Sequence, residues 1–332
     1  MFEGFYNLAG PPFQLTPDTR FFFGSREHER AMAFLRYGIA QQEGFVVVTG
    51  EIGAGKTTLV ERLLASLDYS RYAVGHIAST QLDAYEILSA IAVAFGLAEE
   101  ASKEALIRLI KQNFEMLHRQ GIRPLIIIDE AQALGSDAVE ELRMLSNITQ
   151  SAKVPFQCVL LGQPKFRAAL ADPQSEQFRQ RVIASCHLGA LGIDDTRKYI
   201  EHRLSLVGWK DDPHFMDDAF EELYRSTGGV PRRINILASR LLLLGFLEEK
   251  HSIEANEVRS VAQELELELG PLHGFGELER SNGATLGVVM DRAFEDLQSR
   301  LRQVERMCDR QNRITKRALG LAHRYLQARK PK

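Results

Sequence analysis

The residues best suited to chemistry form one glycine-rich run, Gly50-Glu51-Ile52-Gly53-Ala54-Gly55-Lys56-Thr57-Thr58. Its first eight residues match the P-loop pattern G-x-x-x-x-G-K-[ST]. In such a loop the backbone N–H groups curl around phosphate oxygens, and the N-terminus of the following helix adds positive potential. We expect Lys56 to reach the β- and γ-phosphates of ATP and Thr57 to place its hydroxyl on Mg²⁺.

A pair of carboxylates, Asp129 and Glu130, closes the apolar run that begins at Leu125. Such a pair is often only the point where a strand meets solvent, but beside a P-loop a functional interpretation is favoured. Ligands of open α/β sheets bind at the carboxyl ends of the strands. We therefore expect Asp129 to hold the magnesium ion through water, and Glu130 to orient and deprotonate the attacking water. An adjacent base favours hydrolysis over nucleotide binding alone.

Four further polar residues are candidates for contacts with the γ-phosphate. Gln163 ends an apolar run and either hydrogen-bonds the γ-phosphate or the lytic water, or simply starts a turn before a proline. Arg179 and Arg181 precede another apolar run, where an arginine could reach the γ-phosphate of a neighbouring subunit. Solvated or salt-bridged arginines are the alternative. Arg232 lies in the first turn of a predicted helix and could point back to bound ATP.

The elements that must position these residues alternate between strands and helices. Apolar runs of strand length are separated by longer segments of helical periodicity, which predicts a parallel sheet covered by helices. The predicted strands are Phe45–Thr49, Ala73–Ala78, Leu125–Asp129, Gln157–Gly162 and Ile183–Leu188. After Leu188 only helical patterns follow. The fold class is therefore α/β, a five-stranded parallel P-loop core followed by a small all-helical domain.

The chain divides into three predicted parts. Residues 1–190 form a nucleotide-binding domain with an irregular N-terminal arm, rich in Phe and Pro, that is a candidate wall for an adenine pocket or plain packing. Residues 191–269 form the helical domain. Residues 270–332 form a Gly-rich linker and a basic helix, in which apolar residues from Met290 to Cys308 recur at 4-3-4-3-4 spacing. That spacing suits a short coiled coil, and a lone helix docked on the body is the alternative.

Composition and charge limit the function classes. With 332 residues, 45% hydrophobic and 26% charged, the chain is of ordinary globular type. Cys158, Cys186 and Cys308 form no close pair, which disfavours a zinc ribbon or a disulfide framework. No signal peptide or transmembrane segment is visible, so we expect a cytoplasmic protein. Residues 271–332 carry 13 Lys/Arg against 7 Asp/Glu, and the preceding residues carry 28 against 37. The basic tail suits an anionic partner or a solvated helix.

Several motifs together resemble the ExeA-like AAA+ ATPases, the general secretion pathway protein A family, over about residues 1–268. Within that family they resemble the secretion ATPases of exosortase (PEP-CTERM) and exopolysaccharide loci. Besides the P-loop, the resemblance rests on Pro12-Phe13-Gln14-Leu15-Thr16-Pro17-Asp18, Asp129-Glu130-Ala131-Gln132, Leu161-Gly162-Gln163-Pro164, Arg179-Gln180-Arg181-Val182 and Gly229-Val230-Pro231-Arg232-Arg233-Ile234-Asn235.

The resemblance implies an ATPase core with a helical lid, assembled into a ring or filament with ATP at subunit interfaces. It gives Gln163 the sensor-1 role, Arg232 the sensor-2 role, and Arg179 or Arg181 the role of the arginine finger. It also implies a protein partner in inner-membrane export machinery, with peripheral attachment to that membrane left open. We therefore expect an ATPase that energises or regulates assembly of a secretion or exopolysaccharide export system.

Two alternatives remain at this point. One is a regulator of transposition of the MuB or TniB type, which would bind duplex DNA through the basic tail in a salt-dependent manner. The other is a scaffold that binds ATP and barely hydrolyses it. Against the first, the chain shows no helix-turn-helix or zinc-finger signature, and its body is acidic.

Overall fold

The computed structural model describes residues 2–16, 18–78, 81–98, 102–151, 154 and 156–269. The predicted linker at 270–285, the apolar repeat at 290–308 and the basic C-terminal helix lie outside the described residues. None of the helices within these ranges combines the length and the apolar composition of a membrane span.

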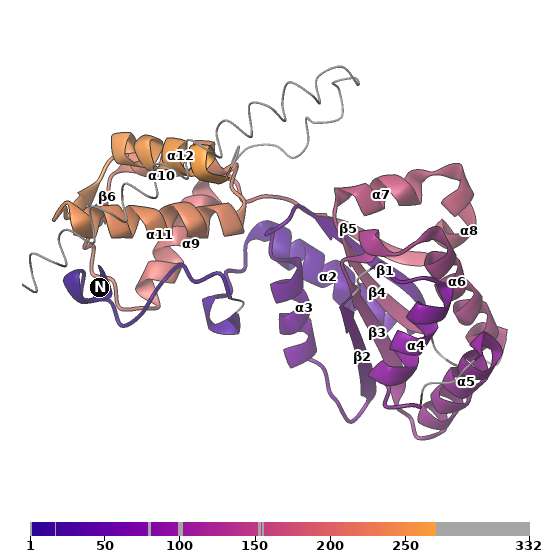
Figure 1. The fold of residues 1–332 in the computed structure, drawn as a ribbon. Helices are drawn as coiled ribbons and strands as arrows, with labels where there is room; N and C mark the ends of the chain where they lie inside the picture. The colour runs from indigo at the N-terminus through magenta and orange to yellow at the C-terminus, as the bar shows by residue number, and fades with distance from the viewer. Residues whose placement is uncertain are drawn as a thin grey trace, which may run out of the picture. The chain divides into compact units, whose positions relative to one another are not determined.

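The predicted parallel sheet is confirmed. It has five strands in the order β2-β3-β4-β1-β5, and every neighbouring pair is parallel (Figure 1). The strands are β1 (Gly44–Gly50), β2 (Tyr72–Ala78), β3 (Arg123–Asp129), β4 (Gln157–Gly162) and β5 (Val182–Leu188). All residues of β1 and β4 are buried. This burial explains why the central strands read as continuous apolar runs rather than as alternating patterns.

Helices cover both faces of the sheet because successive strand residues point to opposite sides. On one face, Val46 and Val48 pack with the apolar sides of α2 (Arg26–Ala40) and α3 (Lys56–Ala65). On the other face, Phe45 and Val47 pack with α4 (Ala84–Ala94), α5 (Lys103–Arg119) and α6 (Ser136–Ser151). Two short helices, α7 (Pro164–Ala171) and α8 (Glu176–Arg179), follow β4. Ser25 caps α2, because its side chain accepts a hydrogen bond from the His28 N–H.

The register of the strands brings their carboxyl ends to one edge. Thr49 of β1 pairs with Gly162 of β4, and Ile128 of β3 pairs with Leu160 of β4. The residues that follow each strand therefore emerge side by side. This edge carries the P-loop, which begins at the last residue of β1, the acidic pair, which begins at the last residue of β3, and Gln163, which follows β4.

The C-terminal part of the described chain is a small domain with a separate apolar core. Its helices are α9 (Ile193–Ser205), α10 (Asp217–Thr227), α11 (Pro231–Leu247) and α12 (Ala255–Leu269). It is helical except for two strands of two residues each, β6 (His214–Phe215) and β7 (Ser252–Ile253), which pair in parallel. The sequence pattern missed this pair, because two residues are too few to show a period.

The N-terminal arm packs on this helical domain. It contains a one-turn helix, α1 (Phe2–Phe5), and a 3₁₀ turn, η1 (Thr19–Phe21). Tyr6, Leu8 and Phe13 are buried in the core of the helical domain, and the Tyr6 hydroxyl donates to the Lys250 carbonyl at 2.9 Å. Burial, helped by the charge of Asp212, raises the pKa of Tyr6 to about 12. The sequence analysis places the arm in the nucleotide-binding domain. In the structure, the apolar side chains of the arm complete the core of the helical domain.

We predict that Gly38→Ala destabilises the protein, although alanine is the better helix former by about 1 kcal/mol. A methyl group at Gly38 would lie 2.3 Å from Cγ2 of Val46, where α2 crosses β1. We expect urea unfolding to show a loss of about 1–3 kcal/mol. In a double-mutant cycle, Gly38→Ala should lower the free energy of unfolding by less when Val46 is also replaced by alanine. A single variant as stable as the parent protein would contradict this view of the helix–sheet contact.

Candidate nucleotide site

The lysine of the P-loop is buried against the backbone of the loop. Lys56 begins α3 and is only 6% exposed. Its Nζ donates to the carbonyl oxygens of Gly50 at 2.8 Å and Glu51 at 3.0 Å. Burial lowers the pKa of Lys56, while the charges of Glu130, Asp129 and Glu51 act in the opposite direction. A buried cation at a helix N-terminus, with neutral carbonyls as its direct partners, is suited to anionic phosphates.

Two glycines give the loop its curvature. Gly53 and Gly55 have φ of +82° and +95°, a conformation that residues with a Cβ rarely adopt. The space beside them is also occupied. A methyl group at Gly53 would lie 2.3 Å from Cβ of Arg232, and one at Gly55 would lie 2.8 Å from Nε2 of His28. The loop is therefore a bare backbone cradle of the kind that holds phosphates.

Thr57 and Asp129 meet across the sheet edge. Thr57 Oγ1 donates to Asp129 Oδ2 at 3.0 Å, and the Glu130 N–H donates to the other carboxylate oxygen, Oδ1, at 2.8 Å. A hydroxyl and a carboxylate are oxygen ligands, which suit Mg²⁺, and this ion usually completes its shell with water and substrate phosphates. The residues present therefore fit magnesium. No cluster of three or more His, Cys, Asp or Glu able to hold a metal occurs within the described ranges.

The Glu130 carboxylate is held by two glutamine side chains. Gln163 Nε2 donates to Glu130 Oε2 at 3.1 Å, and Gln132 Nε2 donates to the same oxygen. Gln132 Oε1 in turn accepts from the backbone N–H of Gln163 at 2.9 Å. Glu130 has φ of +52°, which turns the chain sharply after β3. Gln132 was missed as a site residue, because its contact depends on how β3 and β4 sit side by side.

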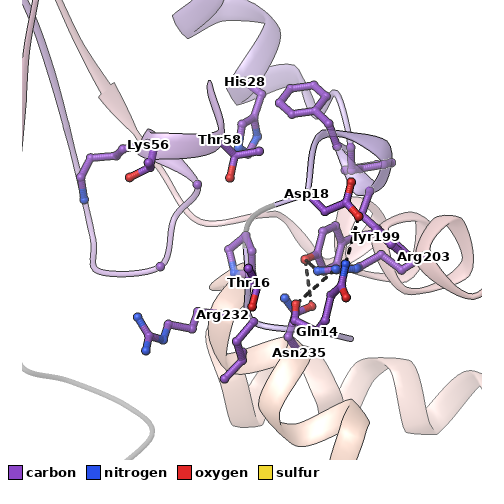
Figure 2. Close-up of a pocket in the computed structure, with 18 of the residues that line it drawn as sticks. Gln14, Thr16, Asp18, His28, Lys56, Thr58, Tyr199, Arg203, Arg232 and Asn235 are labelled. Carbon is purple, nitrogen blue, oxygen red and sulfur yellow. Dashed lines mark hydrogen bonds between the residues drawn. The ribbon is translucent and has the colours of Figure 1, made fainter. Parts of the chain in front are cut away.

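Arg232 lies beside the P-loop. Its backbone N–H donates to the Gly53 carbonyl at 3.2 Å, and its side chain lines the same pocket as Lys56, Thr57 and Glu130. Figure 2 shows Arg232 and Lys56 on the walls of this pocket. The N-terminus of α11 thus brings the helical domain to the phosphate end.

Arg179 and Arg181 lie away from this pocket. Arg179 Nη1 donates to the carbonyls of Leu170 and Asp172, each at 2.8 Å, and Arg181 donates to Asn147 Oδ1. The Arg181 carbonyl accepts from Phe45 at the amino end of β1, the end opposite the P-loop. Neither arginine contacts the phosphate site of its own chain, so a role for either one concerns a neighbouring subunit and stays a prediction.

The far end of the pocket is built from the arm and the helical domain. Gln14 and Thr16 of the arm line it together with Tyr199, Arg203 and Asn235 (Figure 2). Arg203 donates to the Tyr199 hydroxyl at 2.8 Å, and that hydroxyl donates to Asn235 Oδ1 at 2.9 Å. Arg203 also donates to the Gln14 carbonyl at 3.3 Å. This polar network has no local signature in the sequence, because its members come from three separate segments.

The strand order, the curled loop after β1 and the acidic pair after β3 define a P-loop ATPase fold of the AAA class. Residues 39–170 match the family model of the AAA domain. The chain is also 34% identical over 267 residues to general secretion pathway protein A of Aeromonas hydrophila. That alignment covers 80% of this chain and 48% of the relative, so the chain spans about half of the relative's length.

Solved structures of low sequence identity share the fold. The ORC2 protein of Aeropyrum pernix in its ADPNP-ADP complexes superposes with a TM-score of 0.53 at 18% identity, covering 76% of this chain and 71% of that one. Cdc6p of Pyrobaculum aerophilum gives a TM-score of 0.57 at 14% identity, covering 75% and 71%. At these identities the likeness establishes the fold alone.

We predict that Gly53→Ala weakens nucleotide binding by about tenfold or more. A left-handed alanine costs about 1–2 kcal/mol and its methyl group would displace Arg232, so the loop should leave the conformation that cradles phosphate. Titration with a fluorescent ATP analogue measures the loss. Gly96→Ala is the matched control: Gly96 has φ of +71° with nothing within 4 Å of the added carbon. It should lose stability but bind nucleotide normally. If both variants bound the ATP analogue as tightly as the parent protein, the assignment of Gly53 to a phosphate-binding loop would be contradicted.

Proposed function

We propose that the protein binds Mg-ATP at residues 50–58 and hydrolyses it with Glu130 as the general base. The observation that carries this proposal is the position of Glu130. Its carboxylate is oriented by Gln132 and Gln163 at the same strand edge that presents Lys56. A base must be within reach of the proton that it removes, and geometry is the first criterion for choosing one.

Each residue of the site has a separate role in binding or hydrolysis. The backbone N–H groups of the loop and the Lys56 ammonium would bind the phosphates, and Arg232 would add a cation from the helical domain. Thr57 and Asp129 would hold Mg²⁺, which when bound neutralises charge on the β- and γ-phosphates. Glu130 takes a proton from water as the water oxygen bonds to the γ-phosphorus and the bond to ADP breaks. Gln163 orients Glu130 and the water.

The cellular role that we propose is to energise or regulate assembly of a secretion or exopolysaccharide export system at the inner membrane. Its support is the similarity to general secretion pathway protein A, together with the motifs that resemble ATPases of exosortase (PEP-CTERM) loci. We further propose that subunits assemble into a ring or filament, and that Arg179 or Arg181 completes the site of a neighbour.

We predict that Glu130→Gln lowers the rate of ATP hydrolysis by about 10²–10⁴-fold and leaves ATP affinity within about twofold, since the amide keeps the shape of the side chain but cannot take the proton. Steady-state phosphate release and nucleotide titration measure the two quantities. Glu104→Gln, at an exposed site in the first turn of α5, is the matched control. Unchanged hydrolysis in Glu130→Gln would refute the assignment of the base.

The same assay at low salt, with and without duplex DNA, separates the two cellular roles. We expect the rate to be independent of DNA. A several-fold rise that disappears by about 200 mM salt would instead indicate the transposition-type regulator, because DNA contacts with phosphates weaken steeply as salt increases.

We predict that Lys56→Ala and a variant that lacks the finger arginine, Arg181→Ala or Arg179→Ala, are each inactive alone and regain hydrolysis when mixed. The first variant keeps its arginine but loses its own phosphate site, and the second keeps the site but lacks an arginine for its neighbour. Phosphate release from one-to-one mixtures measures the recovery, and Arg179→Ala in place of Arg181→Ala shows which arginine acts. A mixture as inactive as its parts would contradict shared sites.

A further inference from the structure

A buried histidine, His28, contacts the P-loop but belongs to neither of its motifs. It lies in the first turn of α2, is 6% exposed, and lines the pocket together with Gly55 and Thr58 (Figure 2). Nε2 of His28 would be 2.8 Å from a methyl group at Gly55. The imidazole therefore rests directly against the backbone of the phosphate cradle.

One ring nitrogen is held by the helix cap. Ser25 Oγ is 2.7 Å from Nδ1 of His28 and accepts from the His28 backbone N–H at 3.3 Å. Because this oxygen already accepts the cap hydrogen bond, its hydroxyl hydrogen is available to donate to Nδ1. That assignment leaves the ring hydrogen on Nε2, the nitrogen that faces the P-loop.

The other ring nitrogen pairs with the P-loop backbone. His28 Nε2 lies against the backbone at Gly55, and the neighbouring Ala54 backbone acts on the imidazole as a hydrogen-bonding group that raises the pKa of His28. The Ala54 N–H already donates to the Glu51 carbonyl at 3.1 Å. We therefore assign the Ala54 carbonyl as the acceptor for Nε2–H of His28, because a carbonyl that accepts from the ring favours its protonated form. The neutral imidazole has one donor and one acceptor, and both are matched here.

Burial keeps the imidazole in this state. It lowers the pKa of His28 to about 4, against the opposing effects of the Ala54 hydrogen bond and the charge of Asp195. Phe22 of the arm packs edge-on against the ring, with centroids 5.6 Å apart. The guanidinium carbon of Arg62, on the P-loop helix α3, lies over the Phe22 ring, 4.1 Å from the ring centroid. The imidazole is thus held by Ser25 at the start of α2 and by Phe22 of the arm, and Phe22 is in turn covered by Arg62 of α3.

Fixing the Ala54 carbonyl also fixes the next N–H group. In a planar trans peptide the C=O and the following N–H point in opposite directions. A carbonyl anchored on the His28 side therefore directs the Gly55 N–H away from His28. In P-loops the N–H groups of the glycine-rich turn are the phosphate donors.

We propose that His28 is a positioning residue for the phosphate cradle, which holds the Ala54–Gly55 peptide so that the Gly55 N–H is presented to nucleotide phosphate. This inference rests on the proposed function, because it presupposes that ATP binds at the P-loop. His28 acts through the backbone and takes no proton in the reaction.

The test compares three substitutions at one position. His28→Phe keeps the ring and removes both polar atoms. His28→Gln places an amide nitrogen near the position of Nε2, and His28→Asn places its polar atoms only near the position of Nδ1. His118→Phe, at an exposed histidine in the last turn of α5, is the matched control. Each full-length variant is assayed for affinity for a fluorescent ATP analogue, for KM and kcat of hydrolysis, and for thermal unfolding.

We expect His28→Phe and His28→Asn to weaken ATP binding and raise KM by about tenfold, the effect of one lost hydrogen bond. Their kcat should change little, because the contact serves the ground state and the transition state alike. His28→Gln should restore affinity to within about threefold of the parent. A merely structural role would lower the melting temperature and the active fraction and leave KM unchanged.

Two outcomes would overturn the inference: affinities of the Phe and Asn variants within twofold of the parent, or a Gln variant as weak as the Asn variant. If His28→Phe does not fold, the Gln and Asn pair decides. Failure of the proposed function is distinguished from these outcomes by the parent protein, which in that case would itself show no ATP binding.

Discussion

Parallel pairing of β1, β4 and β3 holds the candidate site together. Parallel strands in register must end at one edge, so the loops after them converge however far apart they lie in the chain. Gly162 pairs with Thr49, and Leu160 pairs with Ile128. This pairing brings the P-loop, the acidic pair and Gln163 together. Burial of the strands on both faces makes the register costly to shift, because a slip would turn apolar side chains against the wrong helices.

Charge balance at that edge follows from the same arrangement. Lys56 is buried with two backbone carbonyls as its direct acceptors, and Asp129 and Glu130 lie near enough to oppose the effect of burial on its pKa. Under the proposed function, these contacts hold the Lys56 cation and the loop backbone in one arrangement for the phosphates. Such preorganisation is the usual source of electrostatic stabilisation in enzyme sites.

The pocket is lined by the arm, the P-loop region and the helical domain, and these three segments contact one another. The arm is anchored in the core of the helical domain by Tyr6 and Phe13, and its Phe22 packs on His28 at the P-loop. The helical domain also touches the P-loop directly where Arg232 meets Gly53. The helical domain therefore reaches the phosphate cradle by two routes, one through α11 and one through the arm.

The five strands, the main helices, and the residues of the P-loop and the acidic pair could all be predicted from the sequence. These are local patterns: apolar runs report burial, and glycines at fixed spacing report a backbone that must curl around phosphate. The tertiary structure decided which distant groups complete the site. Gln132 reaches Glu130, Arg203 joins Tyr199 and the arm, and His28 lies against Gly55, yet none of these pairings has a fixed spacing in the chain. Each depends on long-range packing of the sheet, the arm and the helical domain, which no local pattern records.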